Sequence, residues 1–168
     1  MIKLQSASIQ DIKKELETRS NKEVIAYCLT LAKYKKDSKE FLGYLLFDSS
    51  DPSLFSVKVK TEVDEQFSVL KAEKNLYFTK KSLRKILRLV MRYSRYASDN
   101  ALTAEWLIHF CTRLNESGIP YRESQVLVNM YQNQLKKIET LVYGMHEDLQ
   151  QDYSRDLEAL QQFLKTKR

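Results

Sequence analysis

Few side chains in this chain could do nucleophilic or metal chemistry: it has two histidines and two cysteines. His109 lies four residues after Glu105 and two before Cys111, and His146 stands directly before Glu147. A di-metal carboxylate bundle needs Glu-x-x-His on two helices, whereas the single Glu-x-x-x-His here has a different spacing. A Cys111–His109 pair is disfavoured because residues two apart on a helix do not face each other. We therefore assign no catalytic and no metal-binding residue, and expect His109 to be partly buried.

The sequence also lacks the loops that bind phosphate or present a nucleophile. It contains no G-x-S-x-G, P-loop, C-x-x-C or G-x-G-x-x-G motif, and only three glycines. Backbone cradles for phosphate depend on glycine-rich turns. We therefore expect a protein that is not an enzyme and that needs no cofactor.

One segment, residues 74–98, carries most of the electrostatic character of the chain. It holds eight of the 28 lysines and arginines and none of the 22 acidic residues, so the formal net charge of +6 is concentrated there. On a helix, six of its cations fall within an arc of roughly 100°, and an apolar side that includes Leu83, Ile86, Leu87, Val90 and Ala97 lies opposite. The apolar side predicts a buried face, and the basic side predicts a face for an anion or a partner. The six cations are Lys81, Arg84, Lys85, Arg88, Arg92 and Arg95.

The basic face carries a cost that some interaction must offset. Like charges one turn apart destabilise an isolated helix by about 0.2–0.5 kcal/mol per pair, and Lys80 and Lys81 lie at the positive end of the helix dipole. We favour an ion-pair network within the fold or across a dimer, or a merely hydrated face. The acidic residues available for such a network are Asp148, Asp152 and Asp156, or Glu62, Asp64 and Glu65.

An external anion could offset the same cost in two ways. A nucleic acid could bind the arginines through its phosphates and stack bases on Tyr93 and Tyr96, which flank the stripe. An acidic protein or an anionic membrane surface could also bind, although the core needs the apolar face of this helix. We therefore expect a protein partner or self-association first and a nucleic acid second.

Helix-start signals recur along the chain. The sequences SIQD at 8–11 and SNKE at 20–23 are capping boxes, which predict helices to about residue 19 and to about residue 36. A third, very apolar helix is expected after a cap at Asp37 or Ser38, and it should be buried on most sides. Asp51-Pro52 is an N-cap followed by proline at the first helical position.

The helix after Pro52 should continue to Leu70, because its apolar residues keep helical spacing although the β-branched content of 57–63 also permits a strand. The basic helix is predicted over about 79–98, and another over 102–115, closed by Gly118. Residues 122–166 form either one helix of about 60 Å or two helices. We favour a break at 144–147, where Gly144 is the only firm breaker.

These signals predict an all-α protein with seven to eight helices in antiparallel hairpins, arranged as a bundle or a short HEAT-like array. The expected hairpins cover residues 20–47, 51–98 and 101–144, without a repeated residue signature. A hydrophobic content of 43% fits one domain over residues 1–168.

No segment approaches the ~20 apolar residues of a membrane span, and the first residues do not resemble a signal peptide. Cys28 and Cys111 lie in apolar helical patterns, as reduced, buried cysteines do. We expect a cytoplasmic protein without membrane contact.

Three stretches resemble a small family of bacterial cytosolic all-helical proteins. They are residues 31–48 (LAKYKKDSKEFLGYLLFD), 81–88 (KSLRKILR) and 145–150 (MHEDLQ). The resemblance implies a cytosolic bacterial protein and carries no known activity or functional residue. From the residues themselves we predict a non-catalytic helical binding or adaptor module. The alternative is a nucleic-acid-binding accessory protein that uses the basic helix over residues 80–96.

Overall fold

The structure, a computed structural model, describes residues 6–70 and 76–165, and all regular structure in these ranges is helical. Eight α-helices, one π-helical turn and one 3₁₀ turn follow one another, and the described ranges contain no strand. The all-α prediction is confirmed. Residues 57–63, which could have been a strand, lie inside helix α4 (Pro52–Leu70).

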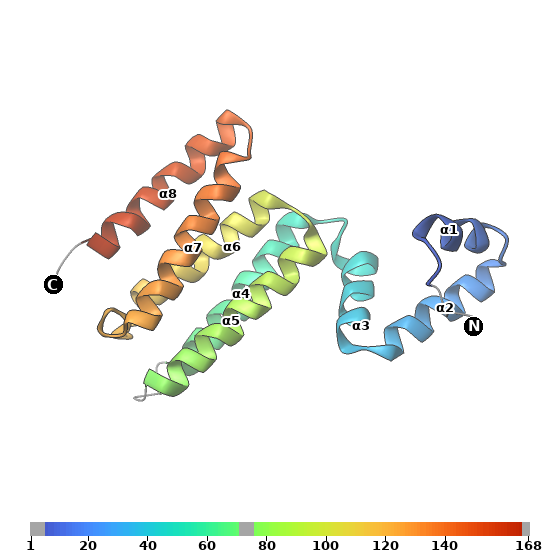
Figure 1. Cartoon of the computed structure of the whole chain (residues 1–168), viewed down its shortest axis with the longest axis horizontal. Helices are drawn as coiled ribbons and strands as arrows, with labels where there is room; N and C mark the ends of the chain where they lie inside the picture. The colour runs from blue at the N-terminus through green and yellow to red at the C-terminus, as the bar shows by residue number, and fades with distance from the viewer. Residues whose placement is uncertain (1–5, 71–75, 166–168) are drawn as a thin grey trace, which may run out of the picture. The chain divides into compact units, whose positions relative to one another are not determined.

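The helices form two compact units, Met1–Ser50 and Asp51–Arg168 (Figure 1). The expectation of one domain over residues 1–168 stays a prediction, because a compact packing unit need not be a unit of cooperative unfolding.

The first unit contains α1 (Ile9–Glu17), α2 (Asn21–Tyr34), α3 (Lys36–Gly43) and the π-helical turn η1 (Tyr44–Asp48). Both predicted capping boxes form. The Ser8 hydroxyl accepts from the Asp11 N–H at 3.2 Å and the Ser20 hydroxyl from the Glu23 N–H at 3.3 Å. The hydroxyl and the backbone N–H of Ser20 both donate to Glu23 and lower the pKa of its carboxyl.

The third helix differs from its prediction in start and in burial. It begins at Lys36 with Lys35 as its N-cap, and no side chain caps it, so the expected cap at Asp37 or Ser38 was wrong. The expected burial was also wrong, because no residue of α3 or η1 is buried and Leu46 and Phe47 are 64% and 78% exposed. Helix α3 packs on α2 and on η1, and a unit of this size offers too little surface to bury an apolar segment on most sides.

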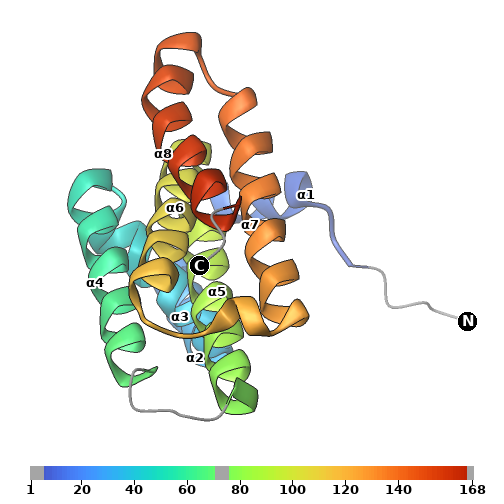
Figure 2. The same ribbon diagram turned by 90° about the vertical axis from the view of Figure 1, so that its left-hand side faces the viewer.

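The second unit contains α4, α5 (Leu76–Ala97), α6 (Asn100–Glu116), the 3₁₀ turn η2 (Tyr121–Glu123), α7 (Gln125–Tyr143) and α8 (Glu147–Lys165). Helices α4, α5 and α6 contact one another, α7 packs on α6, and α8 packs on both α6 and α7. Figures 1 and 2 show α6 between the α4–α5 pair and the α7–α8 pair. Consecutive helices therefore pack as hairpins, as the short connections predict.

The core of this unit is built around α6. Trp106, Phe110 and Leu114 are each 0% exposed, and Phe110 lies 5.5 Å from Phe67 of α4 between ring centroids. Helix α4 meets α6 with the face predicted from its spacing, whose buried residues are Phe55, Val59, Val63, Phe67 and Leu70.

The breaks around α7 are those expected from the glycines. Gly118, just after α6, has a φ of +71°, the left-handed conformation that follows many helix ends. Gly144 is the C-cap of α7, and α8 begins at Glu147. The favoured division of residues 122–166 into two helices is therefore confirmed.

Candidate anion-binding groove

Helix α5 forms the two faces that its sequence predicts. Leu83, Ile86 and Val90 are at most 1% exposed on a helix that packs against α4 and α6. Leu87, which was expected to be buried with them, is only half-buried. On a helical projection it lies about 60° from Arg84, at the edge of the apolar face, and there it lines a groove.

This groove lies between α5 and α7 and has a volume of about 760 Å³. Its α5 wall carries four cations, and none of the described residues that line it is acidic. The wall consists of Tyr77 and Leu87 together with Lys80, Lys81, Arg84 and Arg88.

The six cations singled out from the sequence do not share one environment. Lys81, Arg84 and Arg88 line the groove. Lys85 and Arg95 are exposed elsewhere on α5, and neither lines the groove. Arg92 is half-buried, and its guanidinium carbon lies 5.2 Å from the centroid of the Tyr93 ring.

Of the alternatives that we favoured, the ion-pair network within the fold is not formed by five of the six cations in the described ranges, whereas a network across a dimer stays a prediction. No ion pair there involves the basic side chains Lys80, Lys81, Arg84, Lys85, Arg88 or Arg95. Asp148, Asp152 and Asp156 lie on α8, which packs on α6 and α7. The Asp148 carboxylate lies 3.4 Å from Nδ1 of His146, two residues before it in the sequence. The repulsion among these six side chains is therefore not offset by an acidic partner in the described part of the fold.

The α7 wall of the groove is uncharged and was not predicted from the sequence. It presents the amides Asn129, Asn133 and Gln134 beside the apolar Val126 and Met130. A sequence signal does exist, because residues 125–138 contain five Asn and Gln and no acidic residue. In the described part of the chain, both walls of the groove are thus free of negative charge.

Beyond the groove, α5 and α7 come into direct contact. The Lys137 ammonium lies 3.0 Å from the Met91 sulfur, and burial lowers the pKa of this lysine. The groove-lining residues of both helices all precede this contact, and Tyr77 of α5 and Val126 of α7 lie in the first turns of their helices. The positive ends of both helix dipoles therefore add to the potential at this end of the groove, and their effect falls off beyond the first turn.

On the other flank of α5, Tyr93 connects the helix to α4. Its hydroxyl donates a hydrogen bond of 2.8 Å to Glu62. Burial first, and then this hydrogen bond, raises the pKa of Tyr93 to about 12. Glu62, one of the proposed acidic partners of the basic helix, therefore accepts a hydrogen bond from a tyrosine hydroxyl.

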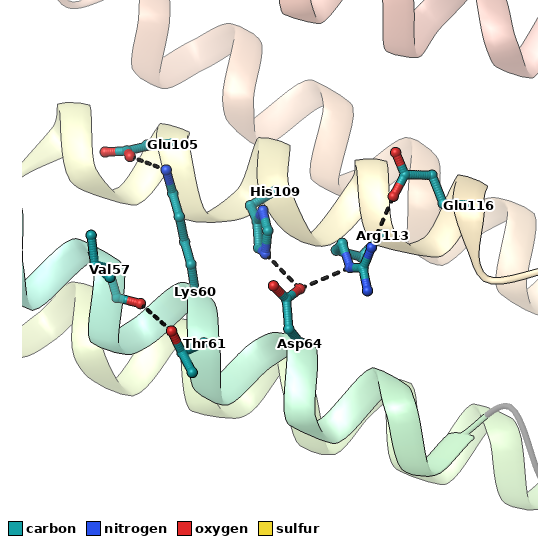
Figure 3. A network of polar contacts seen from close by, with 8 residues as sticks. All are labelled: Val57, Lys60, Thr61, Asp64, Glu105, His109, Arg113 and Glu116. Atoms are coloured by element: carbon teal, nitrogen blue, oxygen red, sulfur yellow. Dashed lines mark hydrogen bonds and ion pairs between the residues drawn. The ribbon is translucent and has the colours of Figure 1, made fainter.

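A polar strip joins α4 and α6 (Figure 3). Lys60 pairs with Glu105, and the Asp64 carboxylate lies 2.8 Å from both His109 Nε2 and Arg113 Nε. Arg113 also pairs with Glu116 at 3.0 Å. The side chains of Asp64, His109 and Arg113 are 22–43% exposed. At such exposure each ion pair contributes about 0–1 kcal/mol to the free energy of unfolding. Figure 3 shows the strip as a helix–helix contact.

The strip does not form a catalytic arrangement. In the described ranges His109 contacts Asp64 but no hydroxyl or thiol, and a nucleophile–base pair needs such a contact. Cys111 is fully buried, and burial raises the pKa of its thiol far above the ordinary value, which keeps it as an unreactive thiol. No group of three or more His, Cys, Asp or Glu side chains in the described part of the chain could hold a metal ion.

No helix within the described ranges has the length and apolar character needed to cross a membrane. Comparisons of the chain with known protein families, with curated proteins and with solved structures found no match.

Proposed function

We propose that this protein is a non-catalytic binding module and that the α5–α7 groove takes an anionic partner. The observation that carries the proposal is the state of Lys81, Arg84 and Arg88. These cations line a concave site without an acidic side chain, and no ion pair within the described ranges involves them.

The energetics favour an external anion. Arg84 and Arg88 are one turn apart, so they repel each other on a free helix by about 0.2–0.5 kcal/mol. An anion placed between them and α7 would relieve this repulsion. A concave, partly apolar site of several hundred Å³ is also the usual form of a binding pocket.

The anionic partner can belong to an acidic protein, to a second copy of this chain or to a nucleic acid, and all three would present their charges to the same wall. A cytoplasmic location, which we also propose, gives access to each of these partners.

Heparin retention of the full-length protein tests the proposal. The variant Arg84→Gln with Arg88→Gln should elute from heparin at a clearly lower salt concentration than the parent, because two groove cations are lost. The matched control is Lys22→Gln with Lys33→Gln, which removes the same charge from exposed positions on α2. If both double variants elute together, retention reports net charge alone and the groove is not the binding site.

A further inference from the structure

We propose that the groove binds a single strand of nucleic acid, an inference that rests on the binding function proposed above. The two walls of the groove differ in chemistry: the α5 wall is cationic and the α7 wall carries uncharged amides and apolar side chains. A single strand has the same division, since phosphates line one edge and bases the other. The geometry therefore matches each wall to one edge of the strand.

The cationic wall follows the direction of a backbone. Lys81, Arg84 and Arg88 succeed one another along α5 at a rise of about 4.5 and about 6 Å. Arginine binds phosphate with a planar fork of donors, and lysine adds a point charge. These three side chains therefore contact successive phosphates along the groove.

The amide wall offers hydrogen-bonding groups to bases. The side-chain carbonyl of Asn129 accepts a hydrogen bond of 2.7 Å from the side-chain amide of Gln125. The side-chain NH₂ group of Asn129 remains available as a donor. The side chain of Asn133, one turn further along the same wall, makes no hydrogen bond in the described part of the structure. Its carbonyl and amino groups can pair with the edge of a base, as asparagine does with adenine.

An aromatic side chain stands beside the cations. Tyr77 lines the groove, is 67% exposed and packs edge-to-face on Phe78 at 5.5 Å between centroids. A base stacked on an aromatic ring contributes about 1–3 kcal/mol and does so for any base sequence. Tyr77 therefore supplies a stacking surface next to Lys80 and Lys81.

The same amides disfavour an acidic helix or a duplex in the groove. An amphipathic acidic helix would place apolar side chains over Asn129 and Asn133, whose amides would lose water without gaining partners. A duplex turns its bases inward and presents mainly phosphates, so it would use the cations and stack no base on Tyr77. Only an unpaired strand satisfies both walls.

The test measures fluorescence anisotropy of full-length protein with a labelled single-stranded RNA or DNA of about 10 nucleotides, within the usual site size of such proteins. A duplex of the same length and an oligoglutamate peptide of similar charge are the competing probes. Affinity for the single strand should exceed affinity for both competitors. The variant Arg88→Gln should reduce the slope of log affinity against log salt by about 0.7.

Two further variants separate base recognition from charge. Tyr77→Leu should weaken single-strand binding by roughly five- to a hundredfold, whereas Tyr77→Phe keeps the ring and should bind like the parent. Asn133→Ala should weaken it by roughly five- to tenfold. Neither Tyr77→Leu nor Asn133→Ala should change heparin retention, because heparin has no bases.

If oligoglutamate or duplex binds as tightly as the single strand, or if Tyr77→Leu and Asn133→Ala bind it like the parent, the inference is overturned. Loss of heparin retention in the Arg84 and Arg88 double variant would then still support an anion-binding groove. If that double variant also retains full heparin binding, the proposed function fails as well.

Discussion

The Trp106 indole N–H donates a hydrogen bond of 2.9 Å to the Ser56 hydroxyl, although the two residues are 50 positions apart in the sequence. Trp106 is 0% and Ser56 4% exposed, so this bond joins α6 to α4 inside the core. The Trp106 ring also lies edge-on to Phe55, with centroids 5.8 Å apart. Together these contacts fix the register of α4 against α6, the central helix of the second unit.

Removing the Ser56 hydroxyl should therefore destabilise the fold. In Ser56→Ala the buried indole N–H has no partner, which costs about 1–3 kcal/mol. Urea unfolding followed by Trp106 fluorescence measures this loss. Ser53→Ala, at an exposed position of the same helix, is the control and should change the free energy of unfolding by less than about 0.5 kcal/mol.

Leu83 and Leu87 should respond differently to truncation although both belong to the apolar side of α5. Leu83 is 0% exposed, so Leu83→Ala should cost about 2–5 kcal/mol. Leu87 is half-buried at the groove, so Leu87→Ala removes less buried surface and should cost clearly less. Equal shifts of the midpoint of thermal unfolding would contradict this assignment of the two positions.

The sequence predicts the helices of this protein well because their signals are local. The capping boxes at Ser8 and Ser20 and the breaks at Gly118 and Gly144 each depend on residues within one or two turns. The buried face of α4 follows from residue spacing alone, because its apolar residues form a single stripe and that stripe must be the face that packs against the core. These features needed no knowledge of neighbouring helices.

The parts that the sequence did not predict depend on which helices are neighbours. The amphipathicity of α5 shows that its cations face outward, but it does not show that α7 forms the opposite wall with Asn129 and Asn133. The same limit explains why the favoured ion pairs between the basic helix and Asp148, Asp152 and Asp156 are not formed in the described ranges. Complementary charges in a sequence do not show that two helices lie side by side. For the apolar segment that ends at Phe47, we predicted burial from composition alone. Its apolar residues do not define one helical face that a neighbouring helix could cover.

Alkaline pH should weaken the fold through Tyr93. Its pKa is raised from 10.0 to about 12 in the folded protein, first by burial and then by its hydrogen bond to Glu62. Because the folded-state pKa lies above the unfolded value, the stabilisation is complete below pH 10 and is lost as the pH rises towards about 12. In Tyr93→Phe the decrease in the free energy of unfolding between about pH 9 and about pH 11 should be shallower than in the parent.

Tyr143→Phe is the control for this comparison, because Tyr143 is 76% exposed and should leave the pH dependence unchanged. Burial raises the pKa values of Tyr121, Tyr131 and Tyr153 as well, so the parent should still weaken at alkaline pH when Tyr93 is replaced. A Tyr93→Phe variant whose stability falls as steeply as that of the parent would show that Tyr93 does not contribute.

Residues 51–168 should fold without residues 1–50. Every buried apolar side chain in the described ranges lies at Phe55 or later in the chain, so the truncation removes no described part of the core. A fragment that begins at Asp51 should unfold cooperatively and keep the near-ultraviolet circular dichroism of Trp106. A fragment that lacks this signal, or that melts without cooperativity, would show that the first unit is needed for the core of the second.

Reversing the charge of the groove should not destabilise the protein. Arg84 and Arg88 take part in no ion pair of the described structure, and both are exposed. In Arg84→Glu with Arg88→Glu each new carboxylate faces a lysine or arginine one turn away, such as Lys80, Lys81 or Arg92. In these pairs an attraction of about 0.2–0.5 kcal/mol replaces a repulsion of similar size, while positions 84 and 88 carry like charges in both proteins and repel each other as before. The midpoint of thermal unfolding should be equal to or slightly above that of the parent, while heparin retention is lost. A marked decrease in the midpoint would mean that these arginines stabilise the fold itself, and the groove would then not be a surface kept free for a partner.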